Sequence, residues 1–281
     1  MADDLAVVAN TGDDVEVYGV HVSPDPDLVT YWLADEIDER GYGIRGDTWH
    51  EMEALEREGR PAWFRLGDRD LAMCRLRTEQ LRAGRRLTEA HAGVVDAMGV
   101  PARVLPMCDE PVTTHVTARG GTFAFQEFMI LERAEGPVEG VALHGVEHAR
   151  PTPEVLAVLA EAEAIVIGPS NPVISIGPIL AVPGMREAVA GSPAPVVAVS
   201  PFVEGRALKG PTELFCEFAG VETSAAGIAG AYGDLVDGVV ADEPVDGMPC
   251  LVDDTVMDSP ESRRRVAAAT LELARPLYSR P

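Results

Sequence analysis

Short runs of hydrophobic residues that stop abruptly at polar or acidic turns recur along the chain. Five of these runs have the length and composition of buried strands in a parallel sheet, and each is followed by a loop rich in acids, Gly, Pro or Ser. The runs are Leu5–Ala9, Ala164–Ile167, Pro195–Val199, Gly238–Val240 and Pro249–Val252. Because ligands of open parallel sheets bind outside the carboxyl ends of the strands, we expect these polar loops to lie along one edge.

Helical patterns alternate with the strands. Pro153–Glu163 and Pro260–Leu277 both carry apolar residues at helical spacing with a proline near the start, and Ser259 precedes the second as a capping residue. This alternation predicts an α/β fold with a Rossmann-like, open and mostly parallel sheet that has helices on both faces. We expect a single α/β domain over residues 1–281.

The stretch from about residue 28 to 150 departs from this alternation. It shows four helical patterns followed by four short extended segments. The helices are expected at Leu28–Arg40, Thr48–Glu58, Leu71–Ala83 and Thr88–Met98, and the extended segments at Ala102–Pro106, His115–Thr117, Thr122–Glu127 and Val138–Leu143. We interpret this stretch as a helical insertion with a small sheet that covers the ligand edge of the main sheet.

The composition limits the partners of the protein. The chain has 46 acidic and 23 basic residues, a net charge of −23, whereas nucleic acids and anionic membranes are bound by clustered basic side chains. We therefore expect neither partner. Lys209 is the only lysine, and an acidic, lysine-poor surface suits a cytoplasm of very high salt, which predicts a halophilic archaeon as the source.

Location and redox state follow from the same composition. The sequence has no apolar run of the roughly 18 to 20 residues that a membrane span requires, and its first residues are acidic, unlike a secretory signal. These features predict a cytoplasmic protein. The four cysteines are dispersed without C-x-x-C spacing, which favours reduced structural thiols.

One strand-end loop has the composition of a phosphate or nucleotide site. The segment Gly168–Gly177 follows an expected strand and holds two small hydroxyls and an amide between its glycines, so backbone N–H groups can approach a phosphate. A Pro-rich turn is the alternative, and the position at a strand end favours binding. The G-x-x-x-x-G-K-[ST] motif is absent from the sequence, which argues against a P-loop protein. The G-x-G-x-x-G pattern at Gly41–Gly46 follows an expected helix and not a strand, which argues against a dehydrogenase.

Two further segments concentrate charge. The acids Asp13, Asp14, Asp25 and Asp27 flank a short extended run, and their carboxylates are suited to Mg²⁺ that bridges a diphosphate, although acid pairs are common in a chain this acidic. Arg65–Asp70 places two arginines and two acids around a glycine, as in sites that bind phosphate or carboxylate. A solvated ion-pair loop is the alternative for this second segment.

Seven motifs taken in their order along the chain are specific. They are Asn10–Gly19, Ser23–Asp27, Gly46–Thr48, Arg65–Asp70, Leu105–Val112, Gly168–Val173 and Ala207–Pro211. Over essentially the whole chain this series resembles the 2-phospho-L-lactate transferase family of coenzyme F420 biosynthesis.

The resemblance implies a reaction. The ribityl hydroxyl of the deazaflavin Fo (7,8-didemethyl-8-hydroxy-5-deazariboflavin) attacks the lactyl-side phosphorus of lactyl-2-diphospho-5′-guanosine, GMP leaves, and coenzyme F420-0 forms. It also implies Mg²⁺ as cofactor and a possible homodimer, and some lineages of the family use an enolpyruvyl donor. In such a transfer, positioning and charge neutralisation supply most of the rate.

The resemblance also assigns residues. Asp27 and Arg65 match the deazaflavin-binding positions of the family. Asp14 and Asp27 are the expected Mg²⁺ ligands and catalytic residues, and either could help draw the proton from the attacking hydroxyl. Gly168, Ser170 and Asn171 are expected to contact the guanosine diphosphate side of the donor.

One departure from the family concerns the N-terminus. Relatives begin with another strand, a Gly-Gly-x-Gly loop and a helix, ahead of the strand that starts here at Leu5. We expect the start codon to lie roughly thirty to forty residues upstream, the length of a strand-loop-helix unit. An in-frame Gly-Gly-x-Gly upstream would support this expectation, and a chain that truly starts at Met1 is expected to have feeble activity.

A second function class remains open from the sequence. A nucleotide- or sugar-nucleotide-binding regulatory protein of the related gluconeogenesis-factor type would keep the strand-end loops but would need no deazaflavin pocket. The segment Arg65–Asp70, together with Asp27, favours the transferase.

Overall fold

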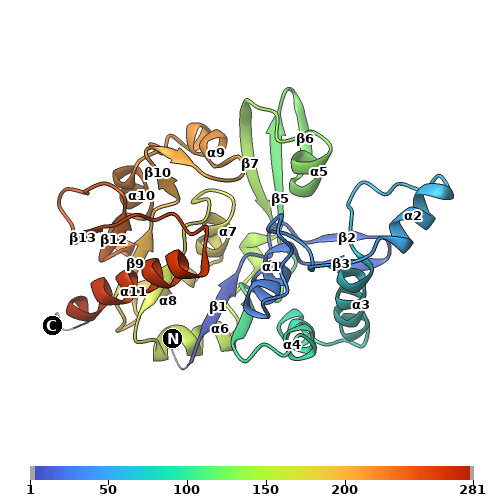
Figure 1. Cartoon of the computed structure of the whole chain (residues 1–281), viewed down its shortest axis with the longest axis horizontal. Coiled ribbons are helices and arrows are strands. Elements are labelled where there is room, and N and C mark those ends of the chain that lie inside the picture. The colour runs from blue at the N-terminus through green and yellow to red at the C-terminus, as the bar shows by residue number, and fades with distance from the viewer. Residues whose placement is uncertain (1–3, 279–281) are drawn as a thin grey trace. The chain divides into compact units, whose positions relative to one another are not determined.

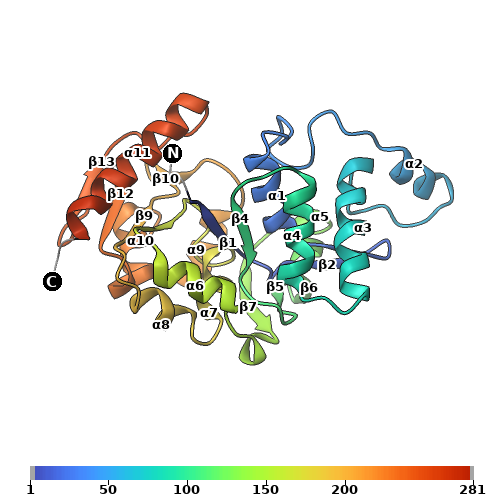
Figure 2. The ribbon, with the colours of Figure 1, turned by 90° about the horizontal axis from the view of Figure 1, so that it is seen from below.

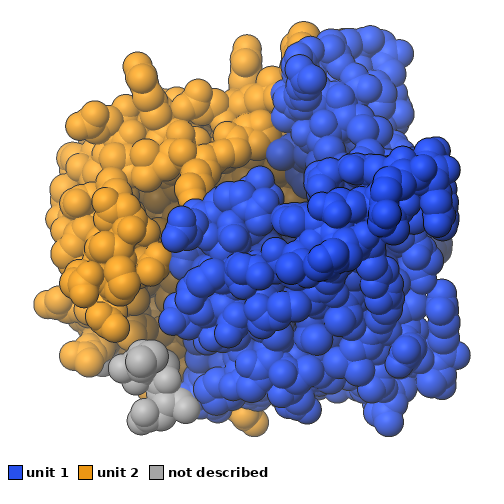
Figure 3. Space-filling model, turned by 45° about the vertical axis from the view of Figure 1, so that its right-hand side comes forward, with its two compact units in different colours: residues 1–135, 141–155 blue, residues 136–140, 156–281 orange. Residues whose placement is uncertain are grey.

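The structure is a computed structural model that describes residues 4–278. These residues form two compact units, which Figure 3 colours separately. The first unit holds the chain up to Glu135 together with Val141–Val155. The second holds Gly136–Gly140 and the chain from Leu156 onward. Each unit is described below by itself.

A pair of parallel strands belongs to the first unit. Strand β1 (Ala6–Ala9) pairs with β4 (Arg103–Pro106), in a register that places Ala6 opposite Arg103. Helix α1 (Pro24–Leu33) packs against both strands, and helix α4 (Leu87–Ala97) packs against β4. Figure 1 shows α1 beside β1, and Figure 2 shows α1 and α4 beside β4. Parallel pairing requires a crossover, and here the chain between β1 and β4 provides it with several helices.

A hairpin and two helices extend the first unit. Strands β2 (Val15–Val17) and β3 (Val20–Val22) are antiparallel and are joined by Tyr18 and Gly19, whose φ angles of 54° and 76° are those of a two-residue hairpin turn. Helices α2 (His50–Arg57) and α3 (Asp68–Arg82) follow. Apolar side chains of the hairpin and both helices form one buried cluster.

The bounds of α1 differ from those expected. The sequence pattern placed a helix at Leu28–Arg40, but α1 begins at Pro24 and ends at Leu33. Proline fits the first helical turn because an N–H group at this position would have no acceptor within the helix, so the N–H that proline lacks is not needed. The helix therefore starts directly after Ser23. It ends early because Asp35 adopts a positive φ of 56°, which turns the chain out of the helix.

A small three-stranded sheet completes the first unit, and β5 and β6 are antiparallel in it. Its strand order is β6-β5-β7, with β5 at Thr113–Ala118, β6 at Gly121–Ala124 and β7 at Val138–His144. Only the part of β7 from Val141 onward belongs to this unit. The expected strand over Thr122–Glu127 was wrong in its second half, because helix α5 (Phe125–Ile130) begins there and buries Phe128.

The second unit contains a four-stranded parallel sheet of order β13-β12-β9-β8. Its strands are β8 (Ile165–Ile167), β9 (Val196–Val199), β12 (Gly238–Ala241) and β13 (Cys250–Val252). Every residue of β9 and β12 is buried, as expected of central parallel strands.

Helices cover both faces of this sheet. Helix α11 (Pro260–Leu277) lies on one face, where Val266 and Ala274 pack against β9 and β12. Figure 2 shows α11 on one side of the strands and α8 and α10 on the other. The remaining helices and the short hairpin are α6 (Pro153–Glu161), α7 (Ile176–Ala181), α8 (Met185–Ala190), α9 (Thr212–Ala219), α10 (Ala225–Tyr232), β10 (Phe202–Val203) and β11 (Arg206–Ala207).

The predicted fold class is confirmed: the chain is α/β with Rossmann-like parallel pairing. Four of the five expected strands form the sheet of the second unit, and the run at Leu5 forms a strand of the first unit. That run, as β1, pairs with β4, which buries Val104 and Leu105 and offers the parallel partner. The single domain over 1–281 and the insertion at about 28–150 stay predictions. Within residues 4–278, no helix is long and apolar enough to cross a membrane.

Candidate active site

Carboxylates gather where β1 ends and α1 begins. The loop Asn10–Asp14 follows β1 directly, and Asp25 lies in the first turn of α1. The side chain of Asn10 connects the two segments, because its Nδ2 lies 3.2 Å from both Asp13 Oδ1 and Asp25 Oδ2. We call Asp13, Asp14 and Asp25 the acidic cluster.

Burial makes the charges of this cluster unfavourable. Burial and then the neighbouring carboxylates of Asp25 and Asp14 raise the pKa of Asp13 well above its usual value. Burial also raises the pKa of Asp25 to about 6, with the Asn10 hydrogen bond opposing and Asp14 adding to the rise. Neither Asp13 nor Asp25 forms an ion pair with a basic side chain within residues 4–278. Crowded carboxylates of this kind gain from a divalent cation.

Asp14 is held by the hairpin and by the residue before α1. Its Oδ1 accepts a hydrogen bond from Ser23 Oγ at 2.7 Å, and its Oδ2 lies 2.9 Å from His21 Nε2. On its other side, His21 Nδ1 lies 2.9 Å from Oε1 of Glu16, the residue opposite it in the hairpin register. Burial raises the pKa of Asp14, and the His21 hydrogen bond opposes this rise.

Asp27 is bound by a buried arginine on α3. Nη1 of Arg77 donates to Asp27 Oδ1 at 2.6 Å and Nη2 donates to Asp27 Oδ2 at 2.8 Å. The Arg77 side chain is 0% exposed and that of Asp27 is 5% exposed, so water hardly reaches the pair. Both carboxylate oxygens thus already have a cationic partner, although the sequence pairs Asp27 with Asp14 as a metal ligand.

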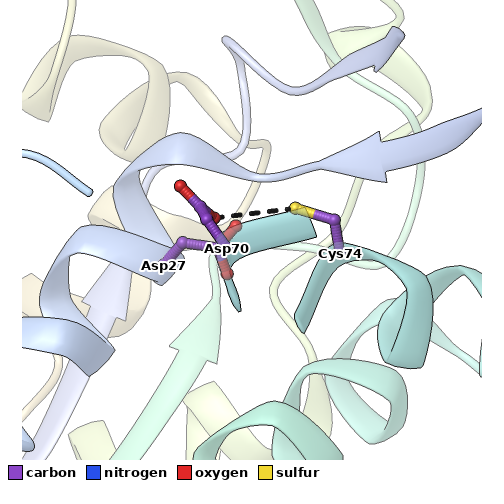
Figure 4. Close-up of side chains that lie close together, drawn as sticks. All are labelled: Asp27, Asp70 and Cys74. Atoms are coloured by element: carbon purple, nitrogen blue, oxygen red, sulfur yellow. Dashed lines mark hydrogen bonds between the residues drawn. The ribbon is translucent and has the colours of Figure 1, made fainter. Parts of the chain in front are cut away.

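Asp27 also belongs to a second group of possible metal ligands. Figure 4 shows Asp27 of α1 beside Asp70 and Cys74 of α3, and one ligand atom from each lies within 4.8 Å of the others. Burial, and then the charge of Asp27, raise the pKa of Asp70 to about 7, and Asp70 Oδ1 accepts a 2.8 Å hydrogen bond from the Tyr31 hydroxyl. A cation in this group would be repelled by the Arg77 guanidinium on Asp27, so we do not favour it as a metal site.

His91 of α4 is a buried neighbour of Asp27 and Thr30. Its Nε2 lies 3.2 Å from Thr30 Oγ1, and its Nδ1 lies 3.9 Å from Asp27 Oδ1. The ring is 0% exposed, and Nδ1 has no hydrogen-bond partner among the described residues. Burial lowers the pKa of His91 from 6.5 to about 4, so the ring is neutral at neutral pH.

This neutral histidine predicts acid sensitivity. Between pH 6.5 and about 4 the unfolded chain binds a proton at His91 and the folded chain does not, so folding loses about 1.4 kcal/mol per pH unit in this window and nothing above it. We expect a His91→Gln variant to escape this loss. Measured by urea unfolding, the stability of the wild type relative to the variant should fall by about 2 kcal/mol from pH 7 to pH 5.

The comparison isolates His91 because other groups titrate equally in both proteins. The raised pKa values of Asp25 and Asp70 favour the folded state as the pH falls, but this contribution cancels in the difference. His148→Gln, at an exposed histidine, is the matched control for the substitution itself, and it should not reproduce the effect of His91→Gln. A constant difference for His91→Gln as well would contradict the assignment.

Arg65 lies in the loop before α3 and is half exposed. Its Nη1 donates to Glu56 Oε1 at 2.5 Å, and its guanidinium lies 5.3 Å from the ring centroid of Trp49. No hydrogen bond or ion pair joins Arg65 to Asp27 within the described chain. The two residues that were expected to bind the acceptor therefore lie in the same unit but contact different side chains: Arg65 contacts Glu56, and Asp27 contacts Arg77.

The other residues of this motif have a structural role that the sequence did not reveal. Asp68 accepts backbone hydrogen bonds from His50 at 3.1 Å and Glu51 at 3.0 Å at the start of α2. In return, Asp47 accepts from the backbone N–H groups of Arg69 and Asp70 at the start of α3. Each aspartate therefore caps the other segment's helix.

Gly67 permits this reciprocal capping. A Cβ atom at Gly67 would lie 2.1 Å from Asp47 Oδ2, so no larger residue fits without moving the cap. Close packing against the loop that contains Asp47, and not contact with a ligand, explains why this motif has a glycine at position 67.

The expected donor loop belongs to the second unit. Gly168 and Ser170 follow β8, and the side-chain Oδ1 of Asn171 accepts from the backbone N–H groups of Val173 at 2.9 Å and Ile174 at 3.2 Å. The Nδ2 of Asn171 is buried and has no partner among residues 4–278. The amide is thus fixed by its oxygen while its donor group remains available for a ligand.

Arg77, His21 and Gln126 were missed by the sequence reading. Gln126 Nε2 donates to Asp13 Oδ2 at 3.0 Å from α5, a helix that the sequence pattern interpreted as a strand. Arg77 had a detectable signal, because it follows Leu71 and Cys74 at helical spacing on the buried face of α3. An arginine on the apolar face of a helix requires a buried partner.

Parallel strands followed by loops rich in acids, amides and glycines define the α/β class of protein, in which ligands bind at the carboxyl ends of the strands. The family model described as 2-phospho-L-lactate transferase CofD matches residues 1–260. The chain belongs to this family and is a transferase of coenzyme F420 biosynthesis. The resemblance inferred from the ordered motifs is thereby confirmed.

Curated relatives agree over most of their length. The chain is 39% identical to a phosphoenolpyruvate transferase of Kitasatospora aureofaciens, over 97% of this chain and 90% of that protein. It is 40% identical to a 2-phospho-L-lactate transferase of Methanosarcina mazei, over 86% of this chain and 79% of that protein. These two similar proteins bear names that differ in the group transferred.

The fold is also found in a solved structure. A protein of the UPF0052 family from Bacillus halodurans matches with a TM-score of 0.58, covering 95% of this chain and 92% of that one, at 18% sequence identity. Similarity at this level of identity shows the shared fold alone. The family match supports the transferase prediction.

Proposed function

We propose that this protein transfers the 2-phospholactate group of lactyl-2-diphospho-5′-guanosine to the ribityl hydroxyl of the deazaflavin Fo, with release of GMP and formation of coenzyme F420-0. The observation that carries the proposal is the acidic cluster, which two of the family-like motifs build at the carboxyl end of β1. The hydroxyl oxygen forms a bond to phosphorus, the bond to the GMP oxygen breaks, and the hydroxyl proton passes to a carboxylate.

Mg²⁺ is the proposed cofactor. The fit is chemical, because the acidic cluster offers several carboxylate oxygens and Mg²⁺ prefers oxygen ligands. Asp14 and Asp25 are the residues that the geometry favours, since Asp27 has both oxygens bound by Arg77. When bound, Mg²⁺ would neutralise charge on the diphosphate.

The residues of the chain would divide the remaining work. Asp25 is only half-buried and its pKa of about 6 lies near neutrality, so it joins Asp14 and Asp27 as a candidate to receive the hydroxyl proton. Asp27 and Arg65 would bind the deazaflavin, as in the family motif. Gly168, Ser170 and Asn171 would bind the guanosine diphosphate side of the donor, with the free Nδ2 of Asn171 as hydrogen-bond donor.

GMP release tests the proposed function. The purified chain is incubated with Fo, Mg²⁺ and either the lactyl or the enolpyruvyl donor, and GMP is quantified by chromatography. We expect GMP to appear only when Fo is present and to disappear when a chelator removes Mg²⁺. Absence of GMP with both donors would contradict the proposal, and the faster donor identifies the group transferred.

Asn171 gives a test of the donor loop. Asn171→Asp keeps the oxygen that accepts from Val173 and Ile174 but replaces the free amide donor by a negative charge. We expect the KM for the guanosine donor to rise about tenfold or more, because a hydrogen bond to a charged group is lost. The KM for Fo serves as the internal control and should stay within about twofold. An unchanged donor KM would remove Asn171 from the proposed site.

The remaining expectations from the sequence are untested. The homodimer, the cytoplasmic location and the halophilic archaeal source stay predictions, as does the exclusion of nucleic acid and membrane partners.

A further inference from the structure

Arg77 joins three segments of the first unit. Arg77 lies on α3, and its Nη1 and Nη2 donate to the two carboxylate oxygens of Asp27 on α1. Its Nη2 also donates at 2.9 Å to the carbonyl oxygen of His21 in strand β3 of the hairpin. A side chain with 0% exposure makes these contacts. The residues on either side of the acidic cluster are therefore fixed relative to α3.

The geometry of the contact between Arg77 and Asp27 indicates that Arg77 orients the Asp27 carboxylate and does more than balance its charge. A planar guanidinium that binds a carboxylate through two parallel hydrogen bonds fixes both the distance and the plane of that carboxylate. Lysine would supply the same charge as a point and would leave the carboxylate free to rotate. Buried ion pairs are often no more stabilising than apolar side chains of similar size, so stability alone is a weak reason for an arginine at this position.

The Asp27 carboxylate, which Arg77 orients, lies at the edge of the candidate active site. Asp27 occupies the first turn of α1, two residues after Asp25, and its backbone N–H donates to the carbonyl oxygen of Ser23, whose hydroxyl binds Asp14. Asp27 Oδ2 accepts from Arg77 and also from the backbone N–H of Ser23 at 3.4 Å, whereas Oδ1, which accepts from Arg77, has a second lone pair that is suited to accept from a hydroxyl. A displacement of Asp27 would therefore change both its own position and that of the first turn of α1.

We propose that Arg77 is a positioning residue for the acceptor side of the transfer reaction: it holds Asp27, and with it the first turn of α1, in the orientation that the acceptor hydroxyl requires. This inference rests on the proposed function. It predicts a defect specific to the acceptor, because Arg77 and Asp27 belong to the first unit and the donor loop Gly168–Asn171 belongs to the second.

Two conservative variants test the proposal in the intact chain. Arg77→Lys keeps the charge but removes the two-pronged contact, and Asp27→Glu keeps the contact groups but moves the carboxylate by one methylene. For both we expect kcat/KM for Fo to fall about 10²-fold, as displacements near 1 Å can cause, while the KM for the guanosine donor stays within about twofold. Arg82→Lys is the matched control: Arg82 lies on the same helix, is exposed and donates to the Gly19 carbonyl, so the kinetic constants of this variant should match those of the wild type.

The outcomes separate the two proposals. If the wild type releases no GMP, the proposed function fails first. If the wild type is active and both variants keep the wild-type kcat/KM for Fo, or lose donor and acceptor affinity to the same extent, the positioning role is overturned. If Arg77→Lys does not fold, Arg77→Gln takes its place, because it also removes the two-pronged contact and leaves the proposed acceptor-binding residue Asp27 unchanged. A drop confined to Fo in the folded variant supports the role.

Discussion

Replacing Asp14 by Asn is expected to lower kcat for GMP release by about 10²-fold to 10³-fold, the largest effect on activity that we predict. Asn has the size of Asp and can still accept from Ser23 Oγ, so the local structure should remain. The variant lacks the negative charge that the proposed Mg²⁺ site requires, and a higher Mg²⁺ concentration for half-maximal activity should accompany the loss. Both quantities come from one titration of GMP release against Mg²⁺.

Glu16→Gln is the matched control for Asp14. Glu16 binds the opposite nitrogen of His21, but its side chain is 67% exposed and lies outside the acidic cluster. We expect nearly wild-type kcat and Mg²⁺ dependence from this variant. Equal losses in both variants would show that His21 and its partners act as a structural unit, and full activity of Asp14→Asn would exclude Asp14 from catalysis and metal binding.

Replacing Arg77 by Met is expected to lower the free energy of unfolding by about 3 to 5 kcal/mol, the largest effect on stability that we predict. The cost arises because Asp27 would be left as a buried carboxylate without its counter-ion, beside the carboxylate of Asp70. Urea unfolding of the two proteins at pH 7.5 measures the difference. The expected loss is a large part of the stability of an ordinary domain.

A double variant distinguishes the unpaired charge from poor packing. Arg77→Met combined with Asp27→Leu removes both charges, so most of the lost stability should return even though activity does not. Arg82→Met, on the exposed face of the same helix, should change stability by less than about 0.5 kcal/mol. If the double variant is no more stable than Arg77→Met alone, the destabilisation comes from packing and the unpaired-charge explanation is wrong.

The motif Arg65–Asp70 illustrates why residue roles were harder to predict than the family. Its sequence suggested anion binding throughout, but Asp68 and Gly67 serve the reciprocal capping of α2 and α3, and Arg65 pairs with Glu56. A motif read along the chain cannot distinguish a ligand from a helix start that folds against it. Both use carboxylates and glycines for the same hydrogen-bonding reasons.

Local sequence patterns were most reliable where a segment's own residues fix its structure. Helix α11 has the bounds that its apolar spacing, Pro260 and Ser259 predicted, because the cap and the periodicity act within the segment. The pattern was misleading at Thr122–Glu127, where α5 begins at Phe125. Phe128 is buried at that point, and this tertiary packing outweighs the local preference for an extended chain.

By itself, the sequence determined the α/β class, the strands that end in polar loops and, through the order of seven motifs, membership of the transferase family. These properties are carried by spacing within short segments, which the chain encodes directly. Only the tertiary structure decided that Ala6–Ala9 pairs with Arg103–Pro106, that Asn10 joins Asp13 to Asp25, and that Arg77 binds Asp27 fifty residues away. Such contacts depend on burial and on which distant segments pack together, and neither can be read from the spacing of residues along the chain.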